Sequence, residues 1–436
     1  MLTCSCGRRF GSDNALTQHQ RDKARRDTAS ACQTPPADPS AQTIRSSGRH
    51  ASYTGWIWRD VRSRKAIQTI SHATVEPSDT PVFSALSCDL LCSYNWQTCK
   101  DATVVIPGFA PVWQDNPLPI TLPKDKGSYF VDQNASRMPQ FPFEPLFRAT
   151  AAMKPGFRFD DVDIVVNRNS LRKLLDFCSG RVKQTFRINL AIVHNSLFLE
   201  RCERSARELI RGSQNSGWGH AFEQAFTKFP LSVDESTGHH RVLHYALGNL
   251  RCVVRFEVDA CYNQTNGKIA DEQAGEQFLA SAIGKLSLAG PSEGRMAEGQ
   301  QFNCPSLMPH STAAEMKTAT KPKSIGHFMP QLWFGRTPWL IVGCHKNGTF
   351  NEVRITHAAA QFQGWEDKHQ AELRKLVTVL AKLRAAVRKN GNRRCIAICE
   401  RGQGPPVISV FPSKVTARPL PDEVIRMFWK SNDMNE

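Results

Sequence analysis

The sequence contains no apolar run that approaches 18 residues, so it offers no candidate for a membrane-spanning helix. Its first ten residues, Met1 to Phe10, lack the apolar core of a secretory signal peptide. Its 14 cysteines are scattered along the chain rather than spaced as a disulfide framework. These absences predict a soluble protein that is nuclear, cytoplasmic or both, is not secreted, and keeps its thiols reduced.

Acidic residues are few relative to basic ones. The 40 Asp and Glu residues stand against 56 Lys and Arg, which gives a formal net charge of +16 and a pI near 9.4. Such an excess favours a polyanionic partner, and we expect RNA or DNA. Apolar residues make up 40% of the 436 residues, enough for one large domain with appendages.

The composition divides the chain unevenly. Residues 1–27 are basic and contain Cys and His, and residues 28–50, rich in Ser, Thr, Pro and Ala, are typical of a disordered linker. Residues 51–135 contain many prolines and form an extension that the sequence patterns leave poorly defined. Residues 136–430 are expected to form the main domain, with a Gly-, Gln- and Ala-rich loop insertion at 263–308.

The end of this domain has clear secondary-structure patterns. Trp339 to Cys344 is typical of a buried strand, and Asn347-Gly348 predicts a hairpin turn into a second strand. Apolar residues at helical spacing predict a helix over about 365–389. Two closing strands are expected at 395–399 and 407–411.

The most informative residues are two pairs of polar side chains, each pair spaced two apart in a predicted strand. Glu257 and Asp259 lie in the strand-like stretch from Leu250 to Ala260, and Glu315 and Lys317 lie in another. Side chains two apart on a strand share a face. Three carboxylates and a lysine on neighbouring strands would form an anionic pocket suited to Mg²⁺ or Mn²⁺, as in metal-dependent phosphodiester hydrolysis. The alternative is a pair of surface strands with ordinary solvated charges.

Another carboxylate, Glu223, is expected in the first turn of a helix from Ala221 to Lys228, where it would interact favourably with the helix dipole. In chain order, Gly219-x-x-x-Glu223, Glu257-x-Asp259 and Glu315-x-Lys317 resemble the signature of the PD-(D/E)XK-type nucleases. More narrowly, they resemble the eukaryotic decapping exoribonuclease (DXO-like) family. Segments around Arg168, Asn195 to Glu200 and Gln331 extend the resemblance to roughly residues 140–360.

The resemblance implies an α/β fold, with a mixed central sheet flanked by helices, and roles for eight residues. Glu223, Asp259 and Glu315 would bind the divalent metals together with the Met316 carbonyl, Glu257 would act through a metal-bound water, Lys317 and Gln331 would position the nucleophile, and Arg168 would contact the substrate phosphates. The chain departs from the family pattern at His220, at Asn169 and in its long gap between Asp259 and Glu315.

The function implied by the resemblance is hydrolysis at RNA 5′ ends that are incompletely capped, metabolite-capped or 5′-phosphorylated. A non-catalytic nucleic-acid-binding protein on the same scaffold and a general endonuclease remain alternatives. Phe159-Asp160-Asp161-Val162-Asp163 also suggests the diphosphate motif of prenyl diphosphate synthases. That reading is disfavoured, because these acids precede a strand-like segment and no second such motif is present.

The amino-terminal segment is similar to a Cys₂His₂ zinc finger, which would make Zn²⁺ a second metal. Twelve residues lie between Cys6 and His19, as in such fingers. Cys4 precedes Cys6 by only one intervening residue, and no second histidine follows His19 within five residues. Because tetrahedral Zn²⁺ needs four ligands, a degenerate finger or a chance match is the alternative.

Overall fold

The structure is a computed structural model that describes residues 2–3, 9–10, 55–61, 65–99, 101–205, 209–211, 216–263, 284–288 and 309–430. The chain divides into two units, Met1–Thr54 and Gly55–Glu436. In the first, β1 (Leu2–Thr3) pairs antiparallel with β2 (Arg9–Phe10). Cys4, Cys6 and His19 lie outside the described residues, so the zinc site stays a prediction.

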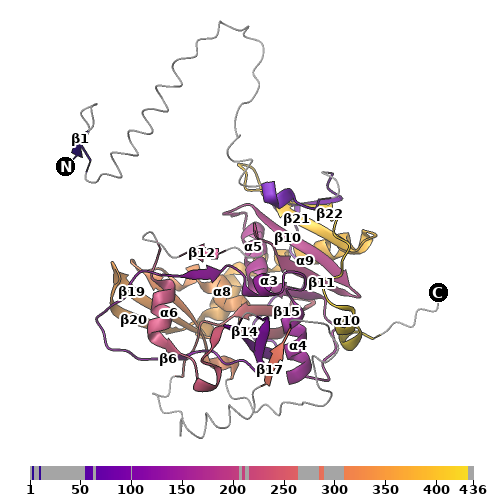
Figure 1. Ribbon diagram of the computed structural model, residues 1–436. Coiled ribbons are helices and arrows are strands. Elements are labelled where there is room, and N and C mark those ends of the chain that lie inside the picture. Colours follow the sequence, from indigo (N-terminus) through magenta and orange to yellow (C-terminus); the bar gives the residue numbers. More distant parts are fainter. Residues whose placement is uncertain are drawn as a thin grey trace. The chain divides into compact units, whose positions relative to one another are not determined.

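The second unit is built on an eleven-stranded mixed sheet (Figure 1). Strands β15, β9 and β11 run parallel to one another, and the other neighbours pair antiparallel. In spatial order the strands are β17 (Gly284–Ser287), β5 (Thr103–Ile106), β4 (Cys88–Gln97), β14 (Ser236–Leu247), β15 (Leu250–Glu257), β9 (Ile164–Asn167), β11 (Ser196–Arg201), β10 (Phe186–Val193), β21 (Arg394–Cys399), β22 (Val407–Pro412) and β3 (Gln68–Ser71).

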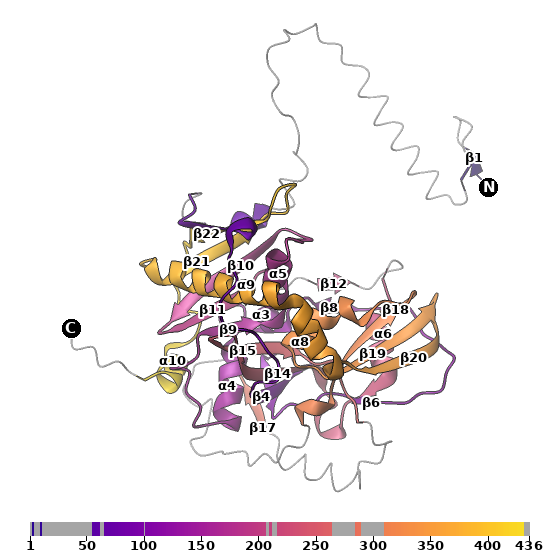
Figure 2. The same cartoon turned by 180° about the vertical axis from the view of Figure 1, so that it is seen from behind.

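Helices cover both faces of this sheet. One face packs against α5 (Arg168–Cys178), α8 (Met329–Phe334) and α9 (Phe362–Lys389), and Figure 2 shows α9 crossing it. The other face packs against α4 (Glu144–Met153) and α10 (Asp422–Phe428). Along β15 the side chains alternate, with Val254 in the first core and Val253 in the second. The predicted α/β class with a mixed, helix-flanked sheet is therefore confirmed.

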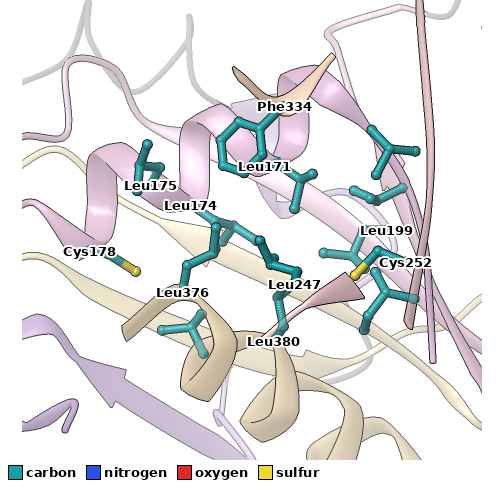
Figure 3. Close-up of a cluster of buried hydrophobic side chains, with 14 of the residues drawn as sticks. Leu171, Leu174, Leu175, Cys178, Leu199, Leu247, Cys252, Phe334, Leu376 and Leu380 are labelled. Atoms are coloured by element: carbon teal, nitrogen blue, oxygen red, sulfur yellow. The ribbon is translucent and has the colours of Figure 1, made fainter. Parts of the chain in front are cut away.

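The larger core joins α5 and α9 to the sheet through leucines from both helices (Figure 3). Leu174 of α5 and Leu376 and Leu380 of α9 are fully buried. Burying each such side chain stabilises the fold by about 1.5–3 kcal/mol. The apolar residues at helical spacing that predicted a helix over about 365–389 are thus the residues that pack α9 against the sheet.

A seven-stranded sheet lies beside the first within the same unit. The helix α6 (Gly219–Phe226) covers it, with Phe222 and Phe226 packed against Ile341 and Phe350. In spatial order its strands are β13 (Thr227–Lys228), β6 (Val112–Trp113), β16 (Ala260–Cys261), β18 (Ala313–Ala319), β19 (Trp339–Lys346), β20 (Thr349–His357) and β7 (Ile120–Thr121).

Residues 51–135 supply strands to both sheets, including the ten-residue β4 near the middle of the larger one. They also supply β8 (Ser128–Phe130), which pairs with β12 (Leu209–Arg211), and lead into α3 (Gln133–Arg137). Within the segment 263–308 that the sequence indicated as loop, Gly284–Ser287 form β17 and extend the sheet edge at β5. Among the described residues, no helix is long and apolar enough to cross a membrane.

Candidate active site at the junction of the two sheets

The candidate site lies where the chain passes from the larger sheet to the smaller one. The sequence pattern predicts one strand from Leu250 to Ala260, but β15 ends at Glu257 and β16 begins at Ala260. The reason is a change of partner: Glu257 still pairs with β14, whereas Ala260 pairs with Ala314 of β18. This crossing places Asp259 beside Glu315.

Lys317 links the two carboxylates at the centre of the site. Its Nζ lies 3.5 Å from Asp259 Oδ2, donates a hydrogen bond to Glu315 Oε1, and donates another to the Met316 carbonyl at 2.7 Å. The Met316 amide donates to Asp259 Oδ2 at 2.8 Å, which fixes this carboxylate against β18. The predicted neighbours Asp259, Glu315 and Lys317 are therefore brought together.

Glu315 is only 1% exposed and is held by residues from two helices. Gln331 of α8 donates through Nε2 to Glu315 Oε1, and Arg168, the first residue of α5, places Nη1 3.2 Å from Oε2. Arg172, one turn further along α5, donates to Gln331 Oε1 at 3.0 Å. Arg168 and Gln331 thus join the cluster, as the sequence predicted, and Arg172 is a member that it did not.

Glu223 lies on α6, but its position within that helix differs from the predicted one. The helix begins at Gly219, two residues early, so Glu223 is not in its first turn. Asp125 caps it instead, accepting from the Gly219 and Ala221 amides at 3.1 and 2.9 Å. Glu223 Oε2 lies 3.3 Å from His220 Nδ1, and the His220 ring stacks on Tyr129 at 3.6 Å.

A pocket of about 580 Å³ opens beside this cluster. Glu223, Glu257 and Asp259 all line it, so the end of β15 and the link to β16 still present both predicted carboxylates to the same space. Tyr129, Phe130 and Phe229 are among its other lining residues, which gives the acidic pocket an aromatic rim.

The carboxylates differ in their electrostatic surroundings. Withdrawal from bulk water and the nearby Glu223 raise the pKa of Glu257 to about 7, although the side chain opens onto the pocket. Burial and the Glu315 charge raise the pKa of Asp259 well above its usual range. Burial opposes ionisation of Glu315 too, but Lys317 and Arg168 outweigh it and hold the pKa of Glu315 below its usual range.

Lys317 is charged because two carboxylates lie next to it. Burial alone would lower its pKa, but Glu315 and Asp259 raise it above the usual value. The cluster thus contains a lysine cation between Glu315, whose ionised form is favoured, and Asp259, whose ionised form is disfavoured.

The donor set suits a hard divalent cation. Its side-chain ligands are all carboxylates, the type that Mg²⁺ and Mn²⁺ prefer, and their mutual repulsion is what a cation relieves. Across the part of the chain that the structure describes, no group of three His, Cys, Asp or Glu side chains is already gathered for a metal. Lys317 lies against Asp259 and Glu315, and Glu223 pairs with His220, so these contacts would have to open.

The sequence analysis did not predict two members of the site, Arg172 and Asp125. Arg172 follows Arg168 at i+4, a spacing that places both on one face of a helix and could have indicated it. Asp125 lies 94 residues before the amide at Gly219 that it caps, so no local pattern signals it.

Comparison with known proteins gives a family and a fold. A family model described as "Domain of unknown function (DUF8563)" matches residues 64–429. A search of curated proteins finds no match. Among solved structures, Candida albicans Rai1 in complex with pU5 and Mn²⁺ covers 84% of this chain and 99% of its own, with 13% identity and a TM-score of 0.53.

Two further structures match at lower scores. Rai1 of S. pombe covers 79% of this chain and 99% of its own, with 12% identity and a TM-score of 0.48. Dxo1 of K. lactis, in complex with manganese, covers 80% of this chain and 97% of its own, with 8% identity and a TM-score of 0.41. The chain therefore belongs to the DUF8563 family, and its second unit shares its fold with Candida albicans Rai1.

Proposed function

We propose that this protein is a metal-dependent hydrolase that acts on the 5′ ends of RNA. The observation that carries the proposal is the Asp259–Lys317–Glu315 cluster beside a pocket that Glu223 and Glu257 also line. The fold supports it, since Candida albicans Rai1 has this fold and its structure contains pU5 and Mn²⁺. The net charge of +16 supports a polyanionic substrate.

The residues that would hold the metal are Glu223, Asp259 and Glu315, with the Met316 carbonyl. A bound Mg²⁺ or Mn²⁺ would polarise a phosphoryl oxygen and lower the pKa of water. Glu257, with a pKa near 7, can accept a proton at neutral pH. Lys317 provides a fixed positive charge, and Gln331, held by Arg172, provides a polar group that orients the attacking water.

Arg168 would contact and position a substrate phosphate. Its guanidinium lies over the Phe256 ring at 5.1 Å and donates to the Glu257 carbonyl at 3.3 Å, so its orientation is fixed before any substrate binds. A fixed cation costs little reorganisation when charge develops on a phosphate. Incompletely capped, metabolite-capped and 5′-phosphorylated RNA are the candidate substrates.

The test is turnover of short RNAs labelled at the 3′ end and carrying a 5′-triphosphate, an unmethylated cap or a 5′-hydroxyl. The full-length protein should process the first or second with Mg²⁺ or Mn²⁺, and EDTA should abolish the reaction. No turnover of either RNA with either metal would contradict the proposal.

A second candidate is a non-catalytic RNA-binding protein, and one observation favours it. Lys317 lies between Asp259 and Glu315, and in the described residues no three ligating side chains are gathered. In that case RNA binding would persist unchanged in EDTA, and no RNA would be cleaved with either metal.

A further inference from the structure

Arg241 on β14 is a buried arginine without an acidic partner. It is 1% exposed, and none of the ion pairs between described residues includes it. Its Nε donates to His239 Nε2 at 3.1 Å, and its Nη1 donates to His310 Nδ1 at 3.3 Å and to the Pro309 carbonyl at 3.4 Å. Burial lowers the pKa of this guanidinium to about 10, so it remains charged at neutral pH.

Both histidines are neutral, and Arg241 fixes which ring nitrogen keeps the proton. Because an arginine only donates hydrogen bonds, His239 keeps its proton on Nδ1 and donates it to Asn95 Oδ1 at 2.7 Å. For the same reason His310 keeps its proton on Nε2 and donates it to the Gly335 carbonyl at 2.9 Å. Burial and the Arg241 charge lower the pKa of His310 to about 3 and that of His239 well below its usual value. We call these four side chains, with the Gly335 carbonyl, the histidine–arginine network.

One end of this network reaches the residues that support Arg168. The His310 ring meets the Phe256 ring edge-on, with centroids 6.0 Å apart, and the Arg168 guanidinium lies over the same Phe256 ring at 5.1 Å. Gly335 packs against both, since a Cβ at this position would lie 3.1 Å from Arg168 Nη1 and 3.2 Å from the Phe256 ring. His310 therefore contacts two groups against which Arg168 rests.

The network also joins three elements around the candidate site. Arg241 belongs to β14, and Gly335 directly follows α8. His310 begins the short helix η5 (His310–Thr312), which leads into β18. Its hydrogen bonds thus fix β14, the end of α8 and the start of β18 relative to one another.

Arg168 faces the pockets, whereas Arg241 and His310 do not. Arg168 lines a smaller pocket, of about 210 Å³, that shares Glu257 with the acidic pocket. Arg241 and His310 line neither pocket, so they can act on a substrate only through the residues that they hold. Burying a guanidinium among neutral partners is unfavourable, and apolar residues of similar volume often stabilise a fold as well or better. Stability alone therefore does not account for Arg241.

We propose that Arg241 and His310 are positioning residues that hold Arg168 in the orientation in which it contacts a substrate phosphate. The inference rests on the function proposed above, in which Arg168 has this role. A cation that is already oriented needs little reorganisation when it meets a phosphate. Loss of the network should therefore weaken the Arg168 contact, although no group that touches the substrate is removed.

The test is a double-mutant cycle on RNA affinity. It uses the full-length protein in EDTA and a short 5′-phosphorylated RNA with a fluorophore at its 3′ end. His310→Phe keeps a ring beside Phe256 but loses both hydrogen bonds, and Arg241→Met removes the cation. Each should weaken RNA binding by about tenfold in wild-type protein, an effect typical of residues in one network. In Arg168→Gln, which already lacks the contact, each should change the affinity by less than about twofold.

His244→Phe is the matched control. His244 also lies on β14, meets the Phe157 ring edge-on at 5.4 Å and lines neither pocket, so this change should leave RNA affinity unaltered in both backgrounds. His310→Gln tests the hydrogen bonds, because its amide can accept from Arg241 and donate to the Gly335 carbonyl, and it should restore most of the affinity. Thermal unfolding identifies the variants that are folded, and the cycle is evaluated from those.

An equal effect of the network variants in the wild-type and Arg168→Gln backgrounds, or no effect in either, would overturn the inference. RNA binding in EDTA that Arg168→Gln leaves unchanged, or no binding by wild type, would overturn it as well. Metal-dependent cleavage would then still support the proposed function. Conversely, coupling between the network and Arg168 without any RNA cleavage would leave the positioning role standing and remove the hydrolase.

Discussion

Asp259 is the residue whose removal best separates catalysis from folding. Its carboxylate accepts from the Met316 amide and neighbours Lys317, and Asn can retain the first contact but not the charge. We expect Asp259→Asn to lower metal-dependent turnover by about a hundredfold or more, a typical effect of losing a charge at a phosphoryl-transfer site. The measurement is single-turnover cleavage of 5′-triphosphate RNA.

Stability should move little, or rise, in the same variant. Burial and Glu315 raise the pKa of Asp259, so its ionised form is disfavoured in the fold, and a neutral amide avoids that repulsion. Asp234→Asn, at an exposed position that lines neither pocket, is the control and should keep full activity. Near wild-type turnover by Asp259→Asn would show that the cluster is not the active site.

Glu257 should make stability depend on pH in a definite direction. Its pKa is about 7 in the folded protein, raised from 4.5, so the folded state holds a proton that the unfolded chain releases between these values. The contribution is therefore complete below about pH 4.5 and is lost as pH rises through 7. In EDTA, the melting temperature of wild-type protein should fall over this range more than that of Glu257→Gln. Parallel curves for the two proteins would contradict the assignment.

At the scale of elements, the position of α6 should depend on a residue remote in sequence. Asp125 caps this helix through two amides, and losing a capping carboxylate costs about 0.5–2 kcal/mol. Asp125→Ala should lower the free energy of unfolding by this amount in denaturant titrations. It should also weaken catalysis, because α6 positions Glu223. Asp115→Ala, at an exposed position in the preceding loop, serves as the control and should change neither quantity.

The same helix shows why parts of the site were not predictable from sequence. The sequence predicted its start at Ala221, whereas the structure begins it at Gly219, whose amide the Asp125 side chain caps. The family resemblance implied that Arg168, Gln331 and Lys317 belong with the carboxylates, and all three contact Glu315. Contacts closed over long sequence separations leave no such pattern.

Strand β4 shows why the sequence patterns left residues 51–135 poorly defined. Its residues Ser93, Asn95 and Gln97 are polar but buried, and hydrogen bonds satisfy them, as when Asn95 Nδ2 donates to the Phe109 carbonyl at 2.8 Å. A strand buried on both faces without an apolar pattern is not visible to hydrophobic periodicity. In contrast, α9 displays its apolar stripe openly, and its prediction over about 365–389 agrees with Phe362–Lys389.

At the scale of the whole molecule, the two units should contribute differently to RNA binding. Each candidate catalytic residue lies in the unit Gly55–Glu436, whereas residues 1–50 carry basic residues such as the run from Arg21 to Arg26. A truncation that starts at Ser52 should keep single-turnover cleavage and show a shallower dependence of binding on salt, since phosphate contacts set that slope. Loss of the chemical step in the truncated protein would contradict this division.

The arrangement of the two pockets also predicts how the protein approaches RNA. The smaller pocket of about 210 Å³ adjoins the acidic one, and its lining includes Asn134, His240 and Arg255, all less than a tenth exposed. We expect this buried lining to leave no path for a continuous strand, so that a phosphodiester at Asp259 would have a chain end on this side. We therefore expect a linear 5′-triphosphate RNA to be processed with release of pyrophosphate, and a circular RNA of the same sequence to remain intact. Equal cutting of the circle would show instead that the cleft admits internal phosphodiesters, and the protein would be a general endonuclease on this fold.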